Sequence, residues 1–593
     1  MNGLRRNQII TTYGFGTIIE LINYTGVLGS PEYWEKNNLP IDEFKKNKIE
    51  DLRLANRINN LQLYTGIKYF LPPGLITDDV KLPFYVFPQY LFCKKCNTLK
   101  KINNWIDQKW LPQNGYMLCN NKFGNNKCNG KLIPSRFVII CPSGHLNDFP
   151  YNEWVHRGRG CEPAELRIEN IPGPSSLASI KISCKKCNKS RTMEGSTTAS
   201  NLVGIYSCEG YLPELNRKEE CSVLSEDLKI VLRNASNLYY PITISSITIP
   251  PLSEKIYNDI LNHSLFDDIK GSSNIEDDAK EFIRTLTKIL IKKYPNENEN
   301  TIKNKIDFLL NPNFDTKTEE NFRFDEYNAF YKTNEEKTEN YIAIQINHNI
   351  NKHNLDKIVK IIRLREIKVL LGYSRIKPID INNCNNSGDS IKLRKIQNKT
   401  SKWLPGVENY GEGVFISFDN ERMFKYEKDI KVIQRYNKFL RNLKTSYYKN
   451  LTISSRFIAL HTFAHILLKR LSFNSGYSLA SMRERIFCNN NDPDNKMNGI
   501  LLYTVDSDID GTMGGLCDLA QPERLTEIIN TALEESHWCS NDPICYESSG
   551  QGMDSLNLAA CHSCALLPET SCEFGNKFLD RAIMHYFFDE DET

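Results

Sequence analysis

Closely spaced cysteines constrain the fold of this chain more than any other feature of its sequence. The 593 residues include 18 cysteines, and three Cys-x-x-Cys pairs stand out: Cys93/Cys96, Cys184/Cys187 and Cys561/Cys564. This spacing lets one tight turn direct two thiolates at a single tetrahedral metal ion. In a reducing compartment such pairs are more often metal ligands than disulfides. The sequence therefore predicts small modules that fold around zinc.

The start of the chain and its overall charge favour a cytoplasmic protein without a membrane partner. The segment Leu4–Gln8 is not followed by the apolar core of a signal peptide. No stretch reaches the ~18 apolar residues of a membrane helix. The 75 basic and 72 acidic residues leave a net charge of +3. Any contact with nucleic acid is therefore expected from a local basic patch.

Length and patterning predict an α+β multidomain protein of roughly three to five domains. Small zinc-ribbon or knuckle modules, a helical middle region and a C-terminal α/β zinc-binding domain are expected. Helical apolar spacing marks residues 265–294, 302–310 and 355–371, and the segment Ile9–Leu21 is expected to form two short strands around a glycine turn. The expected domains are a β-containing segment 1–90, a double knuckle region 91–250, a mainly helical region with linkers 251–450 and the zinc-binding domain 451–593.

The region 91–250 is expected to hold two four-cysteine zinc sites. The predicted ligands are Cys93, Cys96, Cys119 and Cys128 for the first site, and Cys184, Cys187, Cys208 and Cys221 for the second. A further Cys2His2 set lies between them in the sequence, Cys141, His145, His156 and Cys161, but its spacing is irregular. For that segment, a strand that ends in a polar turn is the competing interpretation. The lysines inside both Cys-Lys-Lys-Cys turns suit a phosphate backbone, although solvated lysine is the commoner role.

A third zinc site is expected near the C-terminus. Its predicted ligands are Cys545, Cys561, Cys564 and Cys572, with Cys539 as the alternative fourth ligand. About three structural zinc ions per chain follow from these assignments. Sites saturated by protein ligands are structural rather than catalytic.

His461 and His465 carry the strongest alternative, a catalytic one. They share one face of a predicted helix, but Thr462 replaces the glutamate of a zinc-protease HExxH motif. Histidines packed at a domain contact are therefore favoured over ligands or catalysts. A metal-dependent nuclease or hydrolase would use these two histidines with Asp506. The loop that contains Asp506, Asp508 and Asp510 resembles the start of a calcium loop, but its twelfth position is Cys517 rather than glutamate.

The sequence also lacks the usual signatures of two enzyme classes. It contains no GxxxxGK[ST] loop, so it does not encode a nucleotide-hydrolysing motor in its usual form. The glutamate-containing signature of the zinc deaminases is missing as well. From the residues alone, a stand-alone zinc protein that binds DNA as a regulator is a further alternative.

Several blocks of the sequence resemble a known family. They are Gln8–Gly16, Arg136–Pro150, Leu460–His465, Tyr477–Ile486, Tyr503–Asp508 and Leu556–Cys572. Together they resemble the DrmB family of the DISARM anti-phage defence systems, and the C-terminal third is similar to the MrfA-type zinc-binding domains attached to DNA helicases. The resemblance implies a non-enzymatic, non-motor subunit. Such a subunit would join a separate DrmA-like helicase in the bacterial cytoplasm and engage foreign DNA through that complex.

Overall fold

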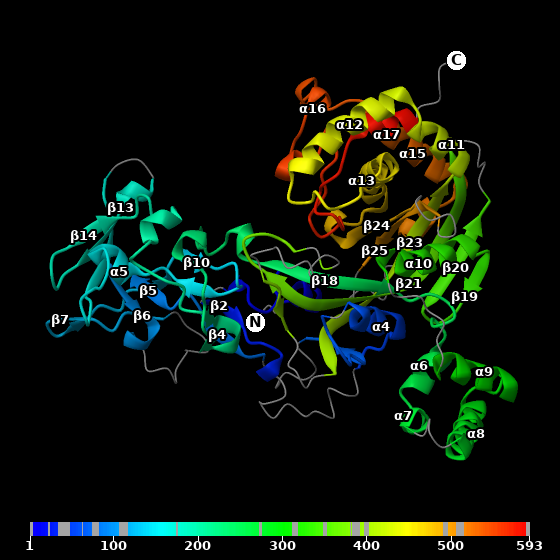
Figure 1. Cartoon of the computed structure of the whole chain (residues 1–593), viewed down its shortest axis with the longest axis horizontal. Helices are drawn as coiled ribbons and strands as arrows, with labels where there is room; N and C mark the ends of the chain where they lie inside the picture. The colour runs from blue at the N-terminus through cyan, green and yellow to red at the C-terminus, as the bar shows by residue number, and fades with distance from the viewer. Residues whose placement is uncertain are drawn as a thin grey trace. The chain divides into compact units, whose positions relative to one another are not determined.

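The computed structural model shows an α+β architecture, as the sequence predicted (Figure 1). It describes residues 4–21, 24–33, 48–61, 63–73, 82–105, 117–172, 176–271, 276–310, 318–347, 353–379, 381, 392–396, 402–489, 496–505 and 515–588. By its internal contacts the chain divides into two compact units. Unit 1 contains Met1–Glu50, Leu61–Ser245 and Lys368–Val407, and unit 2 contains Asp51–Asn60, Ser246–Ile367 and Glu408–Thr593.

Unit 1 is built from small antiparallel sheets. The largest has the order β14-β13-β12-β6-β5-β9, with bounds Ser190–Thr192, Ile180–Cys184, Leu166–Asn170, Thr98–Lys101, Tyr90–Cys93 and Leu132–Pro134. Two three-stranded sheets are β1-β2-β4 (Ile18–Glu20, Thr25–Leu28, Phe84–Val86) and β11-β10-β17 (Leu146–Asp148, Phe137–Ile140, Lys229–Leu232). Two hairpins complete the set, β7-β8 (Lys122–Phe123, Asn126–Lys127) and β15-β16 (Tyr211–Leu212, Arg217–Lys218). Such short strands bury little apolar surface individually, so they need another source of stability.

A buried arginine joins distant segments of unit 1. The Arg375 side chain is fully buried. Its guanidinium donates hydrogen bonds to the carbonyls of Gly144 at 2.8 Å, Leu238 at 2.7 Å and Gly16 at 2.7 Å. Its planar fork of N–H donors suits several acceptors at once. Arg375 therefore connects the two N-terminal blocks that carry the family resemblance.

Unit 2 contains a sheet covered by helices on both faces. Its strand order is β19-β20-β21-β23-β25-β24, with bounds Glu335–Lys337, Tyr341–Ile346, Leu355–Ser374, Trp403–Phe418, Met497–Thr504 and Met482–Asn489. Strands β21 and β23 continue into unit 1, where they pair with β22 (Arg394–Lys395) and β3 (Tyr69–Leu71) respectively. Consecutive strand residues point to opposite faces. Accordingly, Ile416 belongs to one apolar core and the adjacent Phe415 to another.

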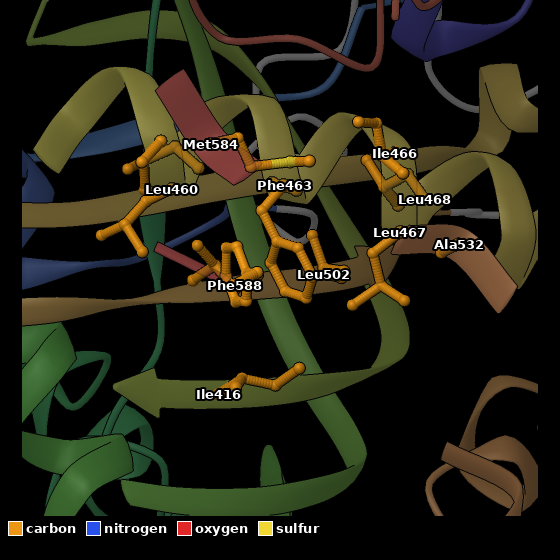
Figure 2. Packing of buried hydrophobic residues seen from close by; sticks show 14 of the residues in the cluster. Ile416, Leu460, Phe463, Ile466, Leu467, Leu468, Leu502, Ala532, Met584 and Phe588 are labelled. Atoms are coloured by element: carbon orange, nitrogen blue, oxygen red, sulfur yellow. The ribbon is translucent and has the colours of Figure 1, made fainter. Parts of the chain in front are cut away.

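The first of these cores surrounds helix α13 (Ser455–Ser475). This helix packs against β24 and β25 and against α15 (Pro522–Ser536) and α17 (Arg581–Phe588). Figure 2 shows Phe463 and Leu467 of α13 above Leu502 and Ile416 of the sheet. Helices α11 (Asn420–Glu427) and α12 (Ile430–Thr445) contribute to the same core, while α10 (Glu319–Lys332) covers the opposite face through Tyr327 and Phe330.

A separate group of helices in unit 2 confirms part of the predicted helical middle region. Its members are α6 (Lys255–Leu261), α7 (Ser264–Gly271), α8 (Glu276–Lys293) and α9 (Glu299–Leu310). They bury an apolar cluster of their own that includes Ile260, Leu286 and Ile306. Among the described residues, no helix combines the length and apolarity that a membrane span requires.

Two secondary-structure predictions were wrong. The segment 355–371 is strand β21 and not a helix. Both faces of this strand are buried, so its apolar residues are nearly continuous and mimic helical spacing. Residues Arg6–Ile10 form helix α1, so the segment Ile9–Leu21 contributes only the strand β1.

Candidate metal centres

The first predicted set of cysteines comes together at two hairpin turns. Cys93 ends β5, Cys96 lies in the turn before β6, and Cys119 and Cys128 flank the β7-β8 hairpin. The Sγ atoms of Cys93 and Cys128 are 3.7 Å apart, as are those of Cys96 and Cys119. With Zn–S bonds of ~2.3 Å, a tetrahedron places its sulfurs ~3.8 Å apart. The spacing of these four buried thiols therefore fits one metal ion.

Hydrogen bonds reach two of the sulfurs in this first cluster, although burial raises the pKa of Cys93 and of Cys119. The backbone N–H groups of Lys95 and Cys96 lie 3.4 Å from the sulfur of Cys93. Burial disfavours ionisation of Cys96, but hydrogen bonds from Thr98 and Asn121 outweigh burial and lower its pKa to about 6. The thiolate is the form that binds metal.

The next two clusters combine the predicted residues differently from the sequence-based assignment. Cys184 and Cys187 lie with His156 and Cys161, whereas Cys208 and Cys221 lie with Cys141 and His145. We call them the inner and outer clusters, since the first lies within the second along the chain. The predicted set that joins Cys184 and Cys187 to Cys208 and Cys221 is not brought together, and neither is the predicted Cys2His2 set.

Tertiary packing explains this grouping. Helix α5 (Tyr151–His156) packs against β13 and β14, which places His156 beside the Cys184–Cys187 turn. The β15-β16 hairpin, between Cys208 and Cys221, packs through β15 on β11, which follows His145. The sequence order of the ligand pairs gave no sign of this nesting.

The outer cluster has a histidine whose coordinating nitrogen is defined by its surroundings. The Sγ atoms of Cys141 and Cys221 are 3.7 Å apart, and Cys208 Sγ is 3.5 Å from His145 Nδ1. The other ring nitrogen, Nε2, lies 2.8 Å from Glu219 Oε1 and 2.7 Å from Arg394 Nη2. Burial opposes ionisation of Glu219, but hydrogen bonds from Arg394 and His145 hold its pKa below the usual value. A carboxylate that accepts the Nε2 proton leaves Nδ1 free to bind metal.

The inner cluster lies closer to solvent. Cys184 is its one buried cysteine, whereas Cys161 is half-buried. His156 Nε2 is 3.1 Å from Cys187 Sγ, and Nδ1 donates to the carbonyl of Asn152 at 2.7 Å. That carbonyl fixes the tautomer in which Nε2 can coordinate.

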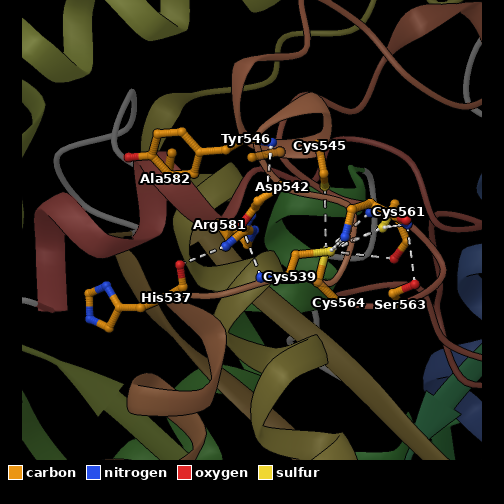
Figure 3. Close-up of polar contacts among 12 residues, drawn as sticks. His537, Cys539, Asp542, Cys545, Tyr546, Cys561, Ser563, Cys564, Arg581 and Ala582 are labelled. Atoms are coloured by element: carbon orange, nitrogen blue, oxygen red, sulfur yellow. Dashed lines mark hydrogen bonds and ion pairs between the residues drawn. The ribbon is translucent and has the colours of Figure 1, made fainter.

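The C-terminal cluster contains Cys539, Cys545, Cys561 and Cys564 (Figure 3). Both candidates for the fourth ligand, Cys539 and Cys545, are therefore present. The sulfur separations are 3.5 Å for Cys539–Cys561 and 3.8 Å for both Cys545–Cys564 and Cys561–Cys564. Burial disfavours the Cys561 thiolate, but hydrogen bonds from Asn541 and from backbone N–H groups lower its pKa to about 6.

Cys572 does not belong to this C-terminal cluster. It lies with His461, His465 and Glu484 in a separate buried group. The Glu484 N–H donates to the carbonyl of Ser571 at 3.2 Å, so this part of the chain runs beside β24 and away from the other cysteines. Glu484 was not singled out from the sequence, because no local motif connects it to a helix earlier in the chain.

An ion pair supports the turn that supplies Cys539 and Cys545. Arg581 of α17 pairs with Asp542 and donates to the carbonyls of Ser536 and His537, both at 3.0 Å. Asp542 in turn accepts the N–H of Cys539 at 2.9 Å. Figure 3 shows this arginine beside the cluster. The metal-binding turn is therefore attached to the helix that packs on α13.

The alternative catalytic set is only partly described. His461 and His465 are fully buried on α13, whereas Asp506, Asp508 and Asp510 lie outside the described residues. A substrate has no access to these histidine side chains in the described structure.

Fold and geometry define an α+β protein with several compact clusters, each able to hold a metal ion. A family model described as a domain of unknown function, DUF8724, matches residues 5–240, a range that includes all three clusters of unit 1. The chain is also 31% identical over 609 aligned residues to the DISARM protein DrmB of Bacillus paralicheniformis (strain ATCC 9945a / NCIMB 11709 / CD-2). That alignment covers 95% of this chain and 97% of the relative. The chain therefore belongs to the DrmB family.

Proposed function

We propose that this chain is a non-motor, zinc-stabilised subunit of a DISARM anti-phage complex. In that complex it partners a DrmA-like helicase and helps to engage foreign DNA. The observation that carries the proposal is full-length similarity to a protein named as a DISARM component. An alignment over 95% of the chain covers both units and not just one metal-binding module.

Zinc is the metal that suits the four cysteine-rich clusters. Thiolate and imidazole ligands in tetrahedral arrangement favour zinc over calcium or magnesium, which prefer oxygen. Each cluster supplies four protein ligand atoms, so no coordination position is left for a substrate. Zinc would act here by supplying folding free energy to small modules. Persistent free thiolates also fit a reducing cytoplasm.

A helicase partner would supply the ATP hydrolysis. The sequence contains no GxxxxGK[ST] loop. Full burial of His461 and His465 also argues against a hydrolase that uses them. The chain would then contribute structure and contacts rather than catalysis.

The exposed lysines of the Cys-Lys-Lys-Cys turns are the proposed DNA contacts. Lys94 and Lys95 are exposed beside the first cluster, and Lys185 and Lys186 beside the inner cluster. A metal-rigidified turn holds such lysines in fixed positions, where they can neutralise phosphates.

Co-expression with a DrmA-like helicase tests the partnership. We expect the tagged chain to retain the helicase through affinity purification and gel filtration in low salt. Separate elution of two folded proteins would contradict the proposal. Purified chain should also leave labelled DNA intact in magnesium or manganese. Cleavage that is lost in His465→Ala would instead establish an enzyme.

A further inference from the structure

A fifth cluster lies in the interior of unit 2 and differs in chemistry from the other four. It joins His461 and His465 of α13, Glu484 of β24 and Cys572 of the C-terminal segment. One potential ligand atom from each residue lies within 4.8 Å of every other. The exposed fractions are 0% for the two histidines and Glu484, and 7% for Cys572.

The short distances converge on one point between these side chains. His461 Nε2 is 2.9 Å from Glu484 Oε1 and 3.3 Å from Cys572 Sγ. His465 Nε2 is 3.3 Å from the same carboxylate oxygen. Tetrahedral zinc would separate these atoms by ~3.4–3.6 Å, given bonds of ~2.0–2.3 Å. A small outward shift of the side chains would therefore accommodate the ion.

The hydrogen bond on the far side of His465 indicates that a cation belongs here. Its Nδ1 donates to the carbonyl of Ala565 at 2.8 Å, and a carbonyl can only accept. In the neutral imidazole, Nε2 is then an acceptor that faces the Glu484 carboxylate. Two buried acceptors in contact are unfavourable unless a proton or a metal cation lies between them.

Two further observations agree with a metal ion at this position. Within the described residues, the second carboxylate oxygen of Glu484, Oε2, is buried and has no hydrogen-bond partner. The backbone N–H of Asn576 donates to Cys572 Sγ at 3.2 Å. The N–H of Lys95 makes the same kind of N–H···S contact with Cys93 in the first cluster. In both places a backbone N–H points at a sulfur that would coordinate the metal.

We propose that His461, His465, Glu484 and Cys572 bind a fifth divalent metal ion, zinc, in a closed structural site. Glutamate and thiolate together supply two negative charges, which neutralise a divalent ion in a buried position. Two imidazoles and one thiolate favour zinc among the common biological divalent ions. The ion would connect the central helix, the sheet and the segment that follows the C-terminal cluster. This site goes beyond the DISARM assignment and does not depend on it.

Metal content of the full-length chain tests the proposal. The measurement is zinc per chain by inductively coupled plasma mass spectrometry, after purification without chelators. The variants are Cys572→Ala and Glu484→Gln, and the control is Cys488→Ala. Cys488 is a partly buried cysteine on β24, and it belongs to none of the five clusters. We expect five zinc ions in the wild type and in the control, and four in each variant.

Equal zinc content in the wild type and in folded Cys572→Ala and Glu484→Gln would overturn the proposal. If these variants do not fold, wild-type crystals at the zinc absorption edge give the answer. An anomalous peak bonded to His461 and Cys572 would establish the site, and its absence beside peaks at the cysteine clusters would refute it. Neither result depends on binding to a helicase, so the two proposals can fail separately.

Discussion

The module around the first cluster in unit 1 and the core around α13 in unit 2 are stabilised by different means. The core around the first cluster contains Leu91, Trp105, Met117 and Leu132, and its remaining buried members are the four cysteines. The core around α13 is larger, and its buried members are aliphatic residues, aromatic residues and methionines. Burial stabilises by ~25 cal/mol per Å² of apolar surface, so a small core contributes little. We therefore expect bound metal to be essential for folding of the module around the first cluster and to contribute less to the stability of the core around α13.

Loss of metal should cause the largest loss of stability. The unfolding should be confined to the modules that depend on the metal. A structural zinc site supplies ~10–16 kcal/mol in small modules. We expect the double variant Cys93→Ala/Cys96→Ala to expose the amides of β5 and β6 to hydrogen exchange, while α13 stays protected. Loss of protection throughout α13, or unchanged protection of β5 and β6, would contradict the contrast between the regions.

Truncation of Phe463 should destabilise unit 2 strongly and leave the metal-dependent modules of unit 1 folded. This ring is fully buried and stacks on Phe588 with centroids 4.2 Å apart. Phe463→Ala removes buried aromatic surface and leaves a cavity, which typically costs ~3–5 kcal/mol. Chemical denaturation should show this loss in the transition of unit 2. Phe473→Ala is the matched control, since Phe473 lies on the same helix and is 77% exposed. An equal loss in both variants would mean that the α13 core does not stabilise unit 2.

Replacement of Arg375 should destabilise unit 1 by a similar or somewhat smaller amount. Arg375→Leu leaves three buried carbonyls without their donors. Each unsatisfied group costs ~1–3 kcal/mol, and partial relaxation reduces the sum. We expect a lower melting temperature for unit 1 than in the control Arg167→Leu, which alters a partly exposed arginine 3.7 Å from Glu169. No difference between the two variants would show that the buried contacts contribute little.

Replacement of Glu219, which contacts the ligand His145 of the outer cluster, should have the smallest effect, a weaker affinity for zinc. Glu219→Gln keeps the shape of the side chain but weakens its hold on His145 Nε2. Residues that orient a metal ligand typically alter affinity 10–100-fold. Competition with a chromophoric chelator should detect faster zinc loss from this variant. Glu194→Gln serves as the control, since Glu194 is exposed and supplies no ligand atom to a cluster. An identical release profile in both variants would exclude the orienting role.

Local spacing in the sequence predicted the parts of this structure that depend on short segments. The ligands of the first cluster lie on two adjacent hairpins, so the structure brings together the four cysteines that spacing had grouped. The helix α13 and helices α8 and α9 were also anticipated from apolar patterning. In these segments local patterning and tertiary packing favour the same structure.

The remaining features depend on contacts between segments far apart in the chain. The nested pairing of the inner and outer clusters follows from how α5 and the β15-β16 hairpin pack, and the spacing does not encode it. Cys572 joins histidines more than a hundred positions earlier rather than its neighbour Cys564. Arg375 contacts carbonyls, which have no sequence signature. Strand β21 was mistaken for a helix because burial on both faces removed its alternation.

If metal ions hold the cysteine-rich clusters together, the purified chain should contain zinc in a fixed ratio to protein. A thiol-modifying reagent should release zinc from the purified wild-type chain, and a colorimetric indicator can then measure it against protein concentration. We expect at least four zinc ions per chain, one for each cysteine-rich cluster. A folded protein that carries fewer than four would contradict it.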